Sequence, residues 1–323
     1  MPTAETAQAR LADIPDLALS IHVPLAPYTR FAIGGEADLY GETVSEDAFV
    51  AALRAARAGS IEVAVIGDGT NLVVSDEGFR GLVLRYRADA VASDGEHVSV
   101  DAGASLQALV DFTVERGLQG LETLAGIPGS VGGAVYGNAG AYGHSISERI
   151  SSVRFFDGSR LGTLDGPACG FHYRESVFKL RKQWVILAAE LRLEPADSDA
   201  LRRTAGEIVE IRNRKFPSTM QCAGSIFKNL LLADLPAEAA AHVPASAVRE
   251  GKVPAAWFLE QVGAKGARRG AIQVADYHSN LIYNSGGGTA ADLCALIGQL
   301  KTRVHERFGL ELEEEVQFIG RRR

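Results

Sequence analysis

The sequence predicts an α+β protein of two domains, and three observations support this fold class. Segments typical of strands and helices alternate along the chain, but the intervals between them are irregular. Several strand-like segments are separated only by short turns, which favours mixed sheets over a regular parallel α/β sheet. The length of 323 residues suits about two domains with enough apolar material for a core.

The first half of the chain alternates short strands with two serine-capped helices. Residues 1–20 are expected to form a mobile or helical lead-in, and 22–27 to be irregular. Helices are expected over 45–58 and from 105 to 117, because Ser45 and Ser105 are good N-cap residues and apolar positions then recur at helical spacing. Strand-like runs cover 37–40, 61–66, 82–84 and 97–100.

The second half has longer helical patterns. Strands are expected at 153–156 and 184–193, and a charged helix at 197–215 ends before Pro217, near the domain boundary at 195–220. A helix follows Pro254, a strand covers 280–283, and a strand-like pattern runs from 310 to 320. The closing helix begins at Thr289, and its expected core stripe is Leu293, Leu296, Ile297, Leu300, Val304 and Phe308.

Composition excludes several classes of function. A net charge of −7 argues against a nucleic-acid partner, and the basic 321–323 segment is expected to be a solvated tail. No apolar run approaches about 18 residues, so no membrane insertion is expected. The first twenty residues lack the apolar segment of a secretory signal. The three cysteines are far apart, which is typical of reduced thiols in a cytoplasmic protein and predicts neither disulfides nor a metal site.

The segment from Leu124 to Gly143 is rich in glycine. It holds seven glycines within residues 126–143, separated mainly by small or apolar residues. Glycine loses more backbone freedom on ordering than any other residue, so neither a helix nor an ordinary strand is expected here. Such a segment indicates close approach of the backbone to a phosphate or a ring edge. The alternative is a glycine-rich structural turn.

A shorter glycine loop, 67–72, follows the apolar run at 61–66, which reads as a buried strand. A strand that leads into a glycine turn indicates phosphate binding by backbone N–H groups. The loop lacks a Walker lysine, and Leu72 stands where the dinucleotide fingerprint needs glycine. The two glycine segments together predict a large phosphate-bearing cofactor.

Five motifs follow one another along residues 20–320. They are GDGTNL at 67–72, GIPGSVGG at 126–133, YRES at 173–176, AGSIFKN at 223–229 and EVQFIG at 315–320. In this order they resemble the motifs of the UDP-N-acetylenolpyruvoylglucosamine reductases, also called UDP-N-acetylmuramate dehydrogenases, of peptidoglycan precursor synthesis. Five ordered motifs over the whole chain are far more specific than any one of them.

The resemblance implies an FAD-binding domain of the vanillyl-alcohol-oxidase (PCMH) type in two subdomains over 20–195, a linking helix over 196–220, and a smaller C-terminal α+β substrate-binding domain over 221–320. It implies non-covalent FAD, NADPH as hydride donor, UDP-N-acetylglucosamine enolpyruvate as substrate, and a cytoplasmic enzyme that is expected to be a monomer. Some members carry an extra loop with a substrate-binding tyrosine. Residues 191–222 contain no tyrosine, so this chain resembles the form without that loop.

The implied substrate is a vinyl ether conjugated to a carboxylate. Its reduction needs positive charge at the carboxylate and a proton source above the adjacent carbon. By resemblance, Arg174 binds the carboxylate, Ser225 supplies the proton, and Glu315 lies beside the carboxylate for steering or for a proton relay. Local sequence alone favours plainer roles, namely an ion pair with Glu175, a turn serine after Gly224, and one member of a solvated run of glutamates.

The binding residues also come from the resemblance. FAD is expected at backbone groups of the first loop and of the glycine-rich segment, which are Gly67, Asp68, Gly69, Thr70, Asn71, Gly126, Ile127, Gly129, Ser130, Gly132, Gly133, Asn138, Ala139 and Gly140. The nucleotide sugar is expected at Tyr173, Lys215, Asn229 and His278. From the sequence alone, Lys215 is equally a surface charge and His278 equally a loop histidine.

Two rival functions remain open at this stage. One is a flavin oxidase on the same fold that acts on an alcohol or hydroxy acid with oxygen and needs no NADPH. The other is a non-catalytic nucleotide-binding module, which would purify without flavin colour.

Overall fold

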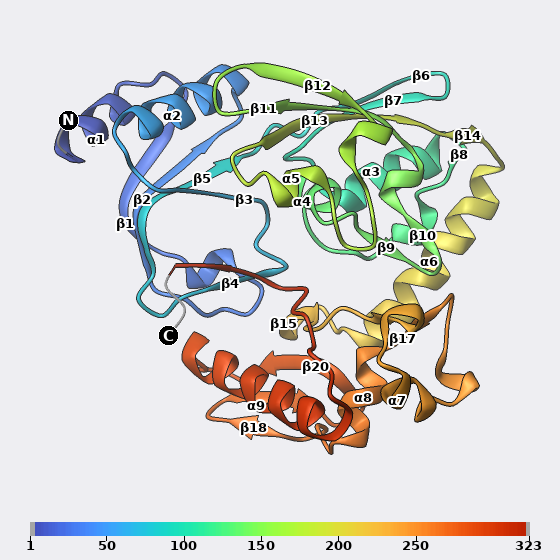
Figure 1. The fold of residues 1–323 in the computed structure, drawn as a ribbon. Helices are drawn as coiled ribbons and strands as arrows, with labels where there is room; N and C mark the ends of the chain where they lie inside the picture. The colour runs from blue at the N-terminus through green and yellow to red at the C-terminus, as the bar shows by residue number, and fades with distance from the viewer. Residues whose placement is uncertain (1–3, 321–323) are drawn as a thin grey trace. The chain divides into compact units, whose positions relative to one another are not determined.

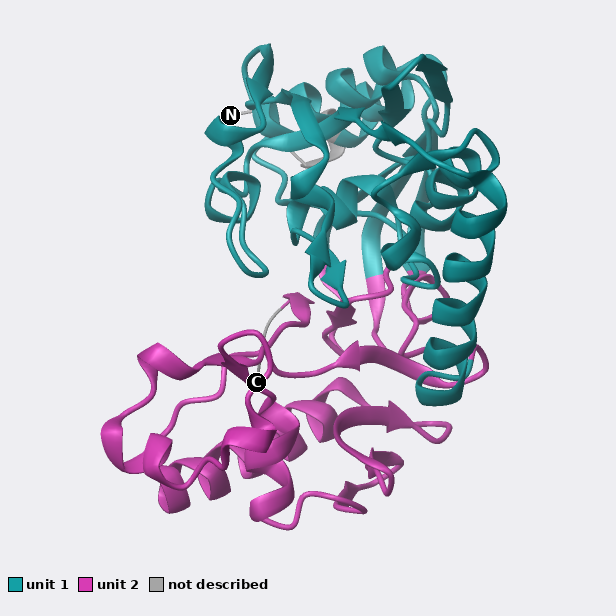
Figure 2. Ribbon diagram, turned by 90° about the vertical axis from the view of Figure 1, so that its right-hand side faces the viewer, with its two compact units in different colours: residues 1–23, 37–68, 80–217 teal, residues 24–36, 69–79, 218–323 magenta. Residues whose placement is uncertain are grey.

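A computed structural model describes residues 4–320, so the expected tail at 321–323 and the first three residues of the lead-in lie outside the described chain. The chain forms two compact units, which Figure 2 colours separately. Unit 1 comprises residues 1–23, 37–68 and 80–217, and unit 2 comprises 24–36, 69–79 and 218–323. Unit 2 therefore includes two short segments from the first third of the chain.

Unit 1 contains two main sheets (Figure 1). The first has the order β1-β2-β5-β3, with β3 and β5 parallel. The second has the order β12-β11-β13-β7-β6, and its neighbours are antiparallel. The strands of the first sheet are β1 (Ala18–Pro24), β2 (Glu36–Thr43), β5 (Phe79–Tyr86) and β3 (Val63–Ile66). Those of the second are β12 (Leu161–Asp165), β11 (Ile150–Phe156), β13 (Val185–Arg192), β7 (His97–Asp101) and β6 (Val91–Asp94).

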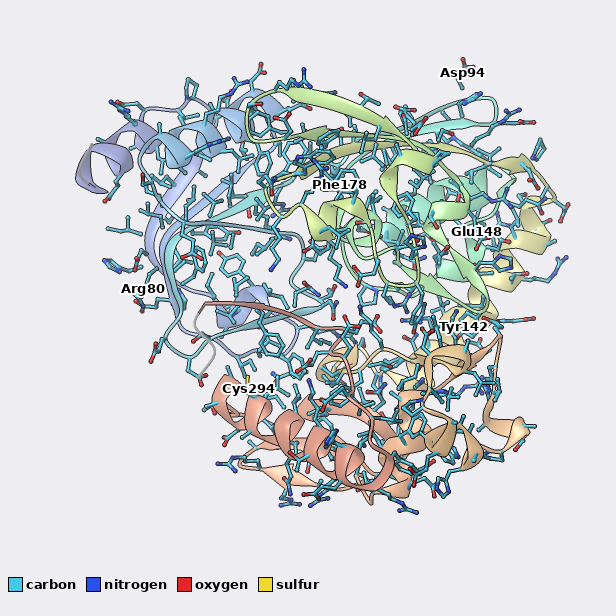
Figure 3. The ribbon with its side chains drawn as sticks, in the orientation of Figure 1. Arg80, Asp94, Tyr142, Glu148, Phe178 and Cys294 are labelled. Atoms are coloured by element: carbon cyan, nitrogen blue, oxygen red, sulfur yellow. The ribbon has the colours of Figure 1, made fainter. Side chains whose placement is uncertain are left out.

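The helices of unit 1 and both of its sheets contribute to one hydrophobic core. Phe178, whose side chain is labelled in Figure 3, lies fully buried in that core. The helices are α1 (Ala4–Ala12), α2 (Glu46–Ala58), α3 (Leu106–Glu115), α4 (Val131–Tyr136), α5 (Val177–Leu180) and α6 (Ser198–Lys215). Two short antiparallel pairs complete the unit, β8 (Leu118–Gln119) with β14 (Glu194–Pro195) and β9 (Gly140–Ala141) with β10 (His144–Ser145).

Unit 2 has its own core, in which α8 and α9 pack with a sheet of order β15-β20-β19-β18. These strands are β15 (Gln221–Ser225), β20 (His278–Asn284), β19 (Ile272–Ala275) and β18 (Arg268–Arg269). The helices are α7 (Ala237–Ala241), α8 (Ala255–Gln261) and α9 (Ala290–Phe308). Two further pairs are β16 (Leu230–Leu231) with β17 (Lys252–Val253), and β4 (Leu72–Val74) in parallel with β21 (Gln317–Ile319).

Single-turn 3-10 helices also connect these elements. They are η1 (Ala26–Tyr28), η2 (Glu122–Leu124), η3 (Ile146–Glu148), η4 (Pro167–Cys169), η5 (Leu232–Asp234) and η6 (Ala245–Ala247).

The capped helices are confirmed. The Ser45 and Ser105 side chains accept hydrogen bonds from backbone N–H groups at the starts of α2 and α3. Thr289 caps α9 in the same way, and Gly309 ends that helix in a left-handed conformation. All six residues of the expected core stripe of α9 are buried. A cap and an apolar stripe that agree thus located each helix from local sequence.

Four expectations about elements are wrong. The glycine-rich segment contains α4, because Ser130 caps it and Val131 and Val135 are buried, and such packing overrides low helix propensity. Residues 22–24 belong to β1, an edge strand, where the proline is tolerated. The strand at 61–66 is not fully buried, because β3 is an edge strand and Val65 is 40% exposed. Of 310–320, only 317–319 pair in a sheet.

Candidate active site

Within unit 1 the two glycine segments touch. A Cβ atom on Gly67 would lie 2.3 Å from the Ser130 Oγ atom, so only glycine fits at this point of the first loop. Gly67 directly follows the edge strand β3, and Ser130 caps α4. The fold therefore brings together two of the segments in which a phosphate-bearing cofactor is expected.

Four backbone N–H groups lie on these two segments without an internal partner. Those of Gly67, Asp68, Gly129 and Ser130 donate to no acceptor within residues 4–320. Gly129 also has a φ angle of +125°, which side chains rarely tolerate. Amide groups that the chain leaves unused suit a ligand rich in acceptor oxygens.

The side chain of Asp68 is held by an arginine from the neighbouring strand. Arg85 on β5 donates from Nη2 to Asp68 Oδ1 at 2.6 Å. Burial lowers the pKa of Arg85, but the hydrogen bonds with Asp68 and Tyr40 outweigh burial and raise that pKa overall. The charged guanidinium of Arg85 thus holds Asp68, the second residue of the first loop. No sequence motif predicted this role for Arg85.

Some glycines of the long segment are needed for packing within the chain. A Cβ atom on Gly132 would lie 3.1 Å from the Ala102 carbonyl oxygen, and one on Gly140 would lie 2.6 Å from the His144 carbonyl oxygen. The Gly132 N–H also donates to the Ala102 carbonyl at 2.8 Å. At Gly132 and Gly140 the backbone therefore approaches other parts of the same chain closely.

Arg174 lies in a tight turn. His172 and Glu175 exchange two backbone hydrogen bonds of 3.1 Å, which leaves Tyr173 and Arg174 as the central residues. Arg174 has a φ of +59°, a left-handed conformation that is uncommon for residues other than glycine and that often marks functional sites. Its Nη2 donates to the Gly140 carbonyl at 3.1 Å, so the glycine-rich segment and the expected catalytic arginine meet.

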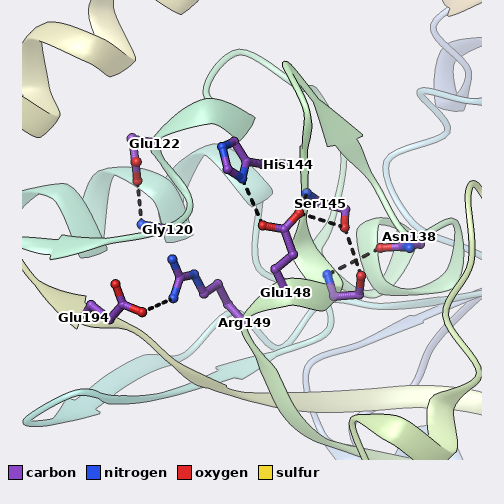
Figure 4. Close-up of polar contacts among 9 residues, drawn as sticks. Gly120, Glu122, Asn138, His144, Ser145, Glu148, Arg149 and Glu194 are labelled. Atoms are coloured by element: carbon purple, nitrogen blue, oxygen red, sulfur yellow. Dashed lines mark hydrogen bonds and ion pairs between the residues drawn. The ribbon is translucent and has the colours of Figure 1, made fainter. Parts of the chain in front are cut away.

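The side chain of Asn138 connects the same two regions. Its Nδ2 donates to the His172 carbonyl at 2.8 Å, and its Oδ1 accepts from the Ser147 N–H at 3.4 Å. Figure 4 shows the second contact beside the His144–Glu148 pair. The amide of Asn138 is therefore used by the chain itself, on the turn that presents Arg174.

Within unit 2, three expected site residues come together. The Asn71 Nδ2 atom donates to the Glu315 carbonyl at 3.0 Å, although 244 positions separate these residues. The Glu315 N–H donates to the carbonyl of Ile226, the residue after Ser225, at 2.7 Å. Ser225 pairs with Leu281 beyond a β-bulge in β15. The Asn71 side chain is thus joined to the backbone of Glu315, which is in turn joined to the backbone of the residue after Ser225.

Sequence reasoning missed the residue that supports this cluster, Asn280. It is 2% exposed, and its side chain both accepts from the Phe227 N–H and donates to the Phe227 carbonyl, each at 2.9 Å. Its own backbone carbonyl accepts from the Ile226 N–H at 3.0 Å. A buried asparagine inside a strand pattern gives no local signal, because its partner Phe227 lies 53 positions away in the sequence.

The expected nucleotide-sugar residues come from both units. His278 Nδ1 accepts from the Asn280 N–H at 3.2 Å, and Asn229 Oδ1 accepts from the Ala255 N–H at 3.3 Å, both in unit 2. Lys215, the last residue of α6 in unit 1, lies 5.0 Å from the centre of the Phe216 ring.

The remaining expected cofactor residues lie in the same two segments. The Gly69 carbonyl accepts from the Arg30 N–H at 3.2 Å, next to Thr70. The Gly126 N–H donates to Gln107 Oε1 at 2.6 Å. The N–H groups of Ile127, Gly133 and Ala139 donate to Leu124, Ser130 and Ala134, respectively. At these last positions any contact to a cofactor uses atoms other than the N–H.

Two kinds of feature are absent from the described part of the chain. Residues 4–320 contain no helix that is long and apolar enough to cross a membrane. The same residues contain no cluster of three or more histidine, cysteine, aspartate or glutamate side chains that is arranged to hold a metal ion.

Two family models match the chain in the regions just described. A model described as "FAD binding domain" matches residues 38–162. A model described as "UDP-N-acetylenolpyruvoylglucosamine reductase, C-terminal domain" matches residues 216–319. The first match contains both glycine segments, and the second contains Ser225 and Glu315.

Whole-length relatives carry the same name. The UDP-N-acetylenolpyruvoylglucosamine reductase of Solibacter usitatus is 62% identical over 311 residues, which cover 96% of this chain and 100% of the relative. That of Bacillus subtilis is 36% identical and covers 92% of each. The crystal structure of the enzyme from Thermus caldophilus is similar with a TM-score of 0.73, at 28% identity, over 94% of this chain and 99% of that one.

Proposed function

Because this chain belongs to the UDP-N-acetylenolpyruvoylglucosamine reductase family, we propose that it is an FAD-dependent oxidoreductase of peptidoglycan precursor synthesis. It reduces UDP-N-acetylglucosamine enolpyruvate to UDP-N-acetylmuramate with NADPH as the hydride donor, in the cytoplasm and as a monomer. The observation that carries this function is the contact, within unit 1, between the glycine-rich segment and the strained turn of Arg174.

The residues of the two glycine segments fit FAD. The N–H groups of Gly67, Asp68, Gly129 and Ser130 are available to the phosphate oxygens of the cofactor. Arg85 keeps Asp68 in place while these groups are occupied. When bound, FAD takes up a hydride from NADPH and passes it to the substrate. We assign the FAD-binding domain to 20–195, the linking helix to 196–220 and the substrate-binding domain to 221–320.

Arg174 binds the carboxylate of the enolpyruvyl group. A guanidinium has five N–H donors in a planar fork, so it can hold the Gly140 carbonyl and still meet a carboxylate in a bidentate manner. As the carbon–carbon double bond breaks and a C–H bond forms at its terminal carbon, negative charge moves toward this carboxylate. A fixed cation there stabilises the developing enolate.

Ser225 then supplies the proton to the carbon next to the carboxylate. Its hydroxyl is a weak acid, but the enolate carbon is a strong base, so transfer is feasible when the geometry is held. Glu315, whose backbone is tied to residue 226, steers the carboxylate or returns a proton to the serine. Tyr173, Lys215, Asn229 and His278 contact the nucleotide sugar in this proposal.

The test is an absorption spectrum followed by two anaerobic mixings. The purified protein should show the visible bands of flavin, lose them on addition of NADPH, and regain them on addition of the enolpyruvyl substrate. Recovery with air but not with substrate would favour the oxidase instead. A colourless protein that binds UDP-sugar would favour a binding module.

The assignment of the glycine segments to FAD has its own test, Gly129→Val. A valine at a φ of +125° is strained and places side-chain atoms beside the unused N–H groups. The variant should fold but purify with little flavin. A folded Gly129→Val protein with full flavin content would remove this segment from the cofactor site.

A further inference from the structure

The conformation of the Arg174 turn needs support from its surroundings. Arg174 occupies a left-handed region that non-glycine residues avoid, with φ at +59°. Two mutual backbone hydrogen bonds close the turn. A side chain that anchors a carbonyl of the turn therefore helps to set the backbone position from which the guanidinium reaches the Gly140 carbonyl.

Two side chains provide such anchors. Asn138, 6% exposed, donates to the His172 carbonyl at 2.8 Å, and its own position is held by the Ser147 N–H. Lys179 donates from Nζ to the Arg174 carbonyl at 2.9 Å and to Glu175 Oε1 at 3.0 Å. Each anchor binds the backbone of the turn, so neither restricts the donors that Arg174 offers to a ligand.

We propose that Asn138 is a positioning residue for Arg174, with Lys179 as a second support, and that together they set the preference of the enzyme for a substrate carboxylate. This proposal depends on the role of Arg174 given above. Asn138 acts on the carbonyl two residues before the arginine, so its loss should affect only ligands whose carboxylate the guanidinium binds. The Asn138 amide is engaged with His172 and Ser147, so the proposal assigns this side chain to the turn and no longer to FAD, and flavin content should stay at the wild-type value.

The decisive variant is Asn138→Asp. Aspartate keeps the size, the tolerance for the φ of +43° at this position and the acceptor for the Ser147 N–H. It loses the Nδ2 donor and places a carboxylate against the His172 carbonyl. Calorimetry should show binding of UDP-N-acetylglucosamine enolpyruvate weakened about tenfold, because the turn loses one hydrogen bond and gains a carboxylate that repels the His172 carbonyl. Binding of UDP-N-acetylglucosamine, which lacks the carboxylate, should equal that of the wild type, as should flavin content.

A matched control lies on the same segment. Glu148→Gln weakens the 2.9 Å pair with His144 but keeps a side-chain oxygen for the Ser145 N–H and touches neither end of the Arg174 turn, so both affinities should stay at wild-type values (Figure 4). Lys179→Met, which keeps the apolar stem, should repeat the selective loss seen with Asn138→Asp. It provides a second test should the aspartate variant fold poorly.

A double-mutant cycle links the effect to the arginine. In an Arg174→Lys background, Asn138→Asp should weaken binding of the enolpyruvyl compound by less than about twofold further, because both changes affect one interaction. Equal weakening for both ligands, loss of flavin, or a full additional tenfold effect in that background would overturn the proposal. Wild-type protein that binds both ligands equally would overturn the role of Arg174 itself, and this inference with it.

Discussion

The two regions that carry the proposed catalytic side chains are supported in different ways. In unit 1, Arg174 sits in a strained turn that polar side chains hold by its backbone carbonyls. In unit 2, Ser225 and Glu315 lie on backbone segments joined by hydrogen bonds through residue 226. The residues that follow them, Ile226 and Val316, are buried in the core of that unit.

This difference predicts that catalysis can change without loss of folding stability in the region of Arg174, but not in the region of Ser225 and Glu315. The supports of Arg174 bind to a turn whose first residue, His172, is exposed, so water can replace a lost hydrogen bond there. The supports of Ser225 are buried between strands, where a lost partner leaves a polar group without water. Substitutions of the supports of Arg174 in unit 1 should therefore change catalysis with little loss of folding stability. Substitutions of the supports of Ser225 in unit 2 should change both catalysis and folding stability.

The largest effect on rate is expected for Ser225→Ala. Hydride uptake from NADPH needs no proton donor at the substrate carbon, so bleaching by NADPH without air should continue at the wild-type rate. Reoxidation by the enolpyruvyl substrate should slow by about 10²–10⁴-fold, the usual contribution of a positioned general acid. Anaerobic stopped-flow traces measure both steps.

Ser225→Cys is the companion variant, because its thiol is a proton donor of lower pKa than a hydroxyl and should recover part of the rate. If Ser225→Ala slows both half-reactions equally, the serine holds the flavin or the fold, and its assignment as proton donor is wrong.

Arg174→Lys should have the next largest effect. Lysine keeps the positive charge but loses the planar fork that matches a carboxylate. Turnover of the enolpyruvyl substrate should fall by roughly 10²-fold, as for the loss of one preorganised transition-state contact, while the unfolding midpoint stays near the wild-type value. The exposed Arg160 offers a control, since Arg160→Lys keeps a charge near Asp157 and should change neither quantity. Wild-type turnover in Arg174→Lys would remove this residue from the site.

The helices of both units were largely predictable from sequence, because the signals that locate a helix are local. Thr289 and the apolar stripe of α9 located a helix because cap and periodicity lie within one segment. Arg174, Ser225 and Glu315 were predicted by motif resemblance, and their roles stay predictions. Sequence did not show that Asn71 meets Glu315, because a contact between residues 244 positions apart depends on the fold.

The supports were missed for the same physical reason. Asn138 was expected among the cofactor residues, and only the structure shows its amide engaged with His172 and Ser147. Asn280 looks like any strand residue until its partner at 227 is known. The helix α4 was missed because glycine content lowered its propensity, whereas its burial depends on neighbours distant in sequence.

Asn280→Ala tests whether the supports of Ser225 contribute more to folding stability than the supports of Arg174. The change leaves a buried N–H and a buried carbonyl of Phe227 without their partners, which costs about 2–4 kcal/mol of unfolding free energy. Lys179→Met should cost about 1 kcal/mol or less, because it removes a partly exposed ion pair with Glu175 and keeps the apolar stem of the side chain. Denaturant unfolding of both variants measures the two values. Equal costs would contradict the distinction between the two kinds of support.

The comparison extends to two buried thiols, one in each unit. Burial raises the pKa of Cys169 to about 11 and also raises the pKa of Cys222, so at pH 8 both should alkylate far more slowly than a free cysteine, by about 10²-fold at Cys169. Below these pKa values the thiolate fraction grows about tenfold per pH unit, so both rates should rise with pH. Cys294 on α9, labelled in Figure 3, is more exposed and should react first.

The order in which Cys169 and Cys222 are alkylated compares the mobility of the two regions. Cys169 ends the single turn η4, close in sequence to the Arg174 turn, and its Sγ donates to the Asp165 carbonyl at 3.3 Å. Cys222 lies in β15, paired with Tyr283 of β20 inside a sheet. Segments held by few buried contacts open more often than strands within a core. Cys169 should therefore be labelled before Cys222, as peptide mass spectrometry of timed alkylation would show. Faster labelling of Cys222 would mean that the serine region is the more mobile of the two, and that its backbone hydrogen bonds do not hold it as described.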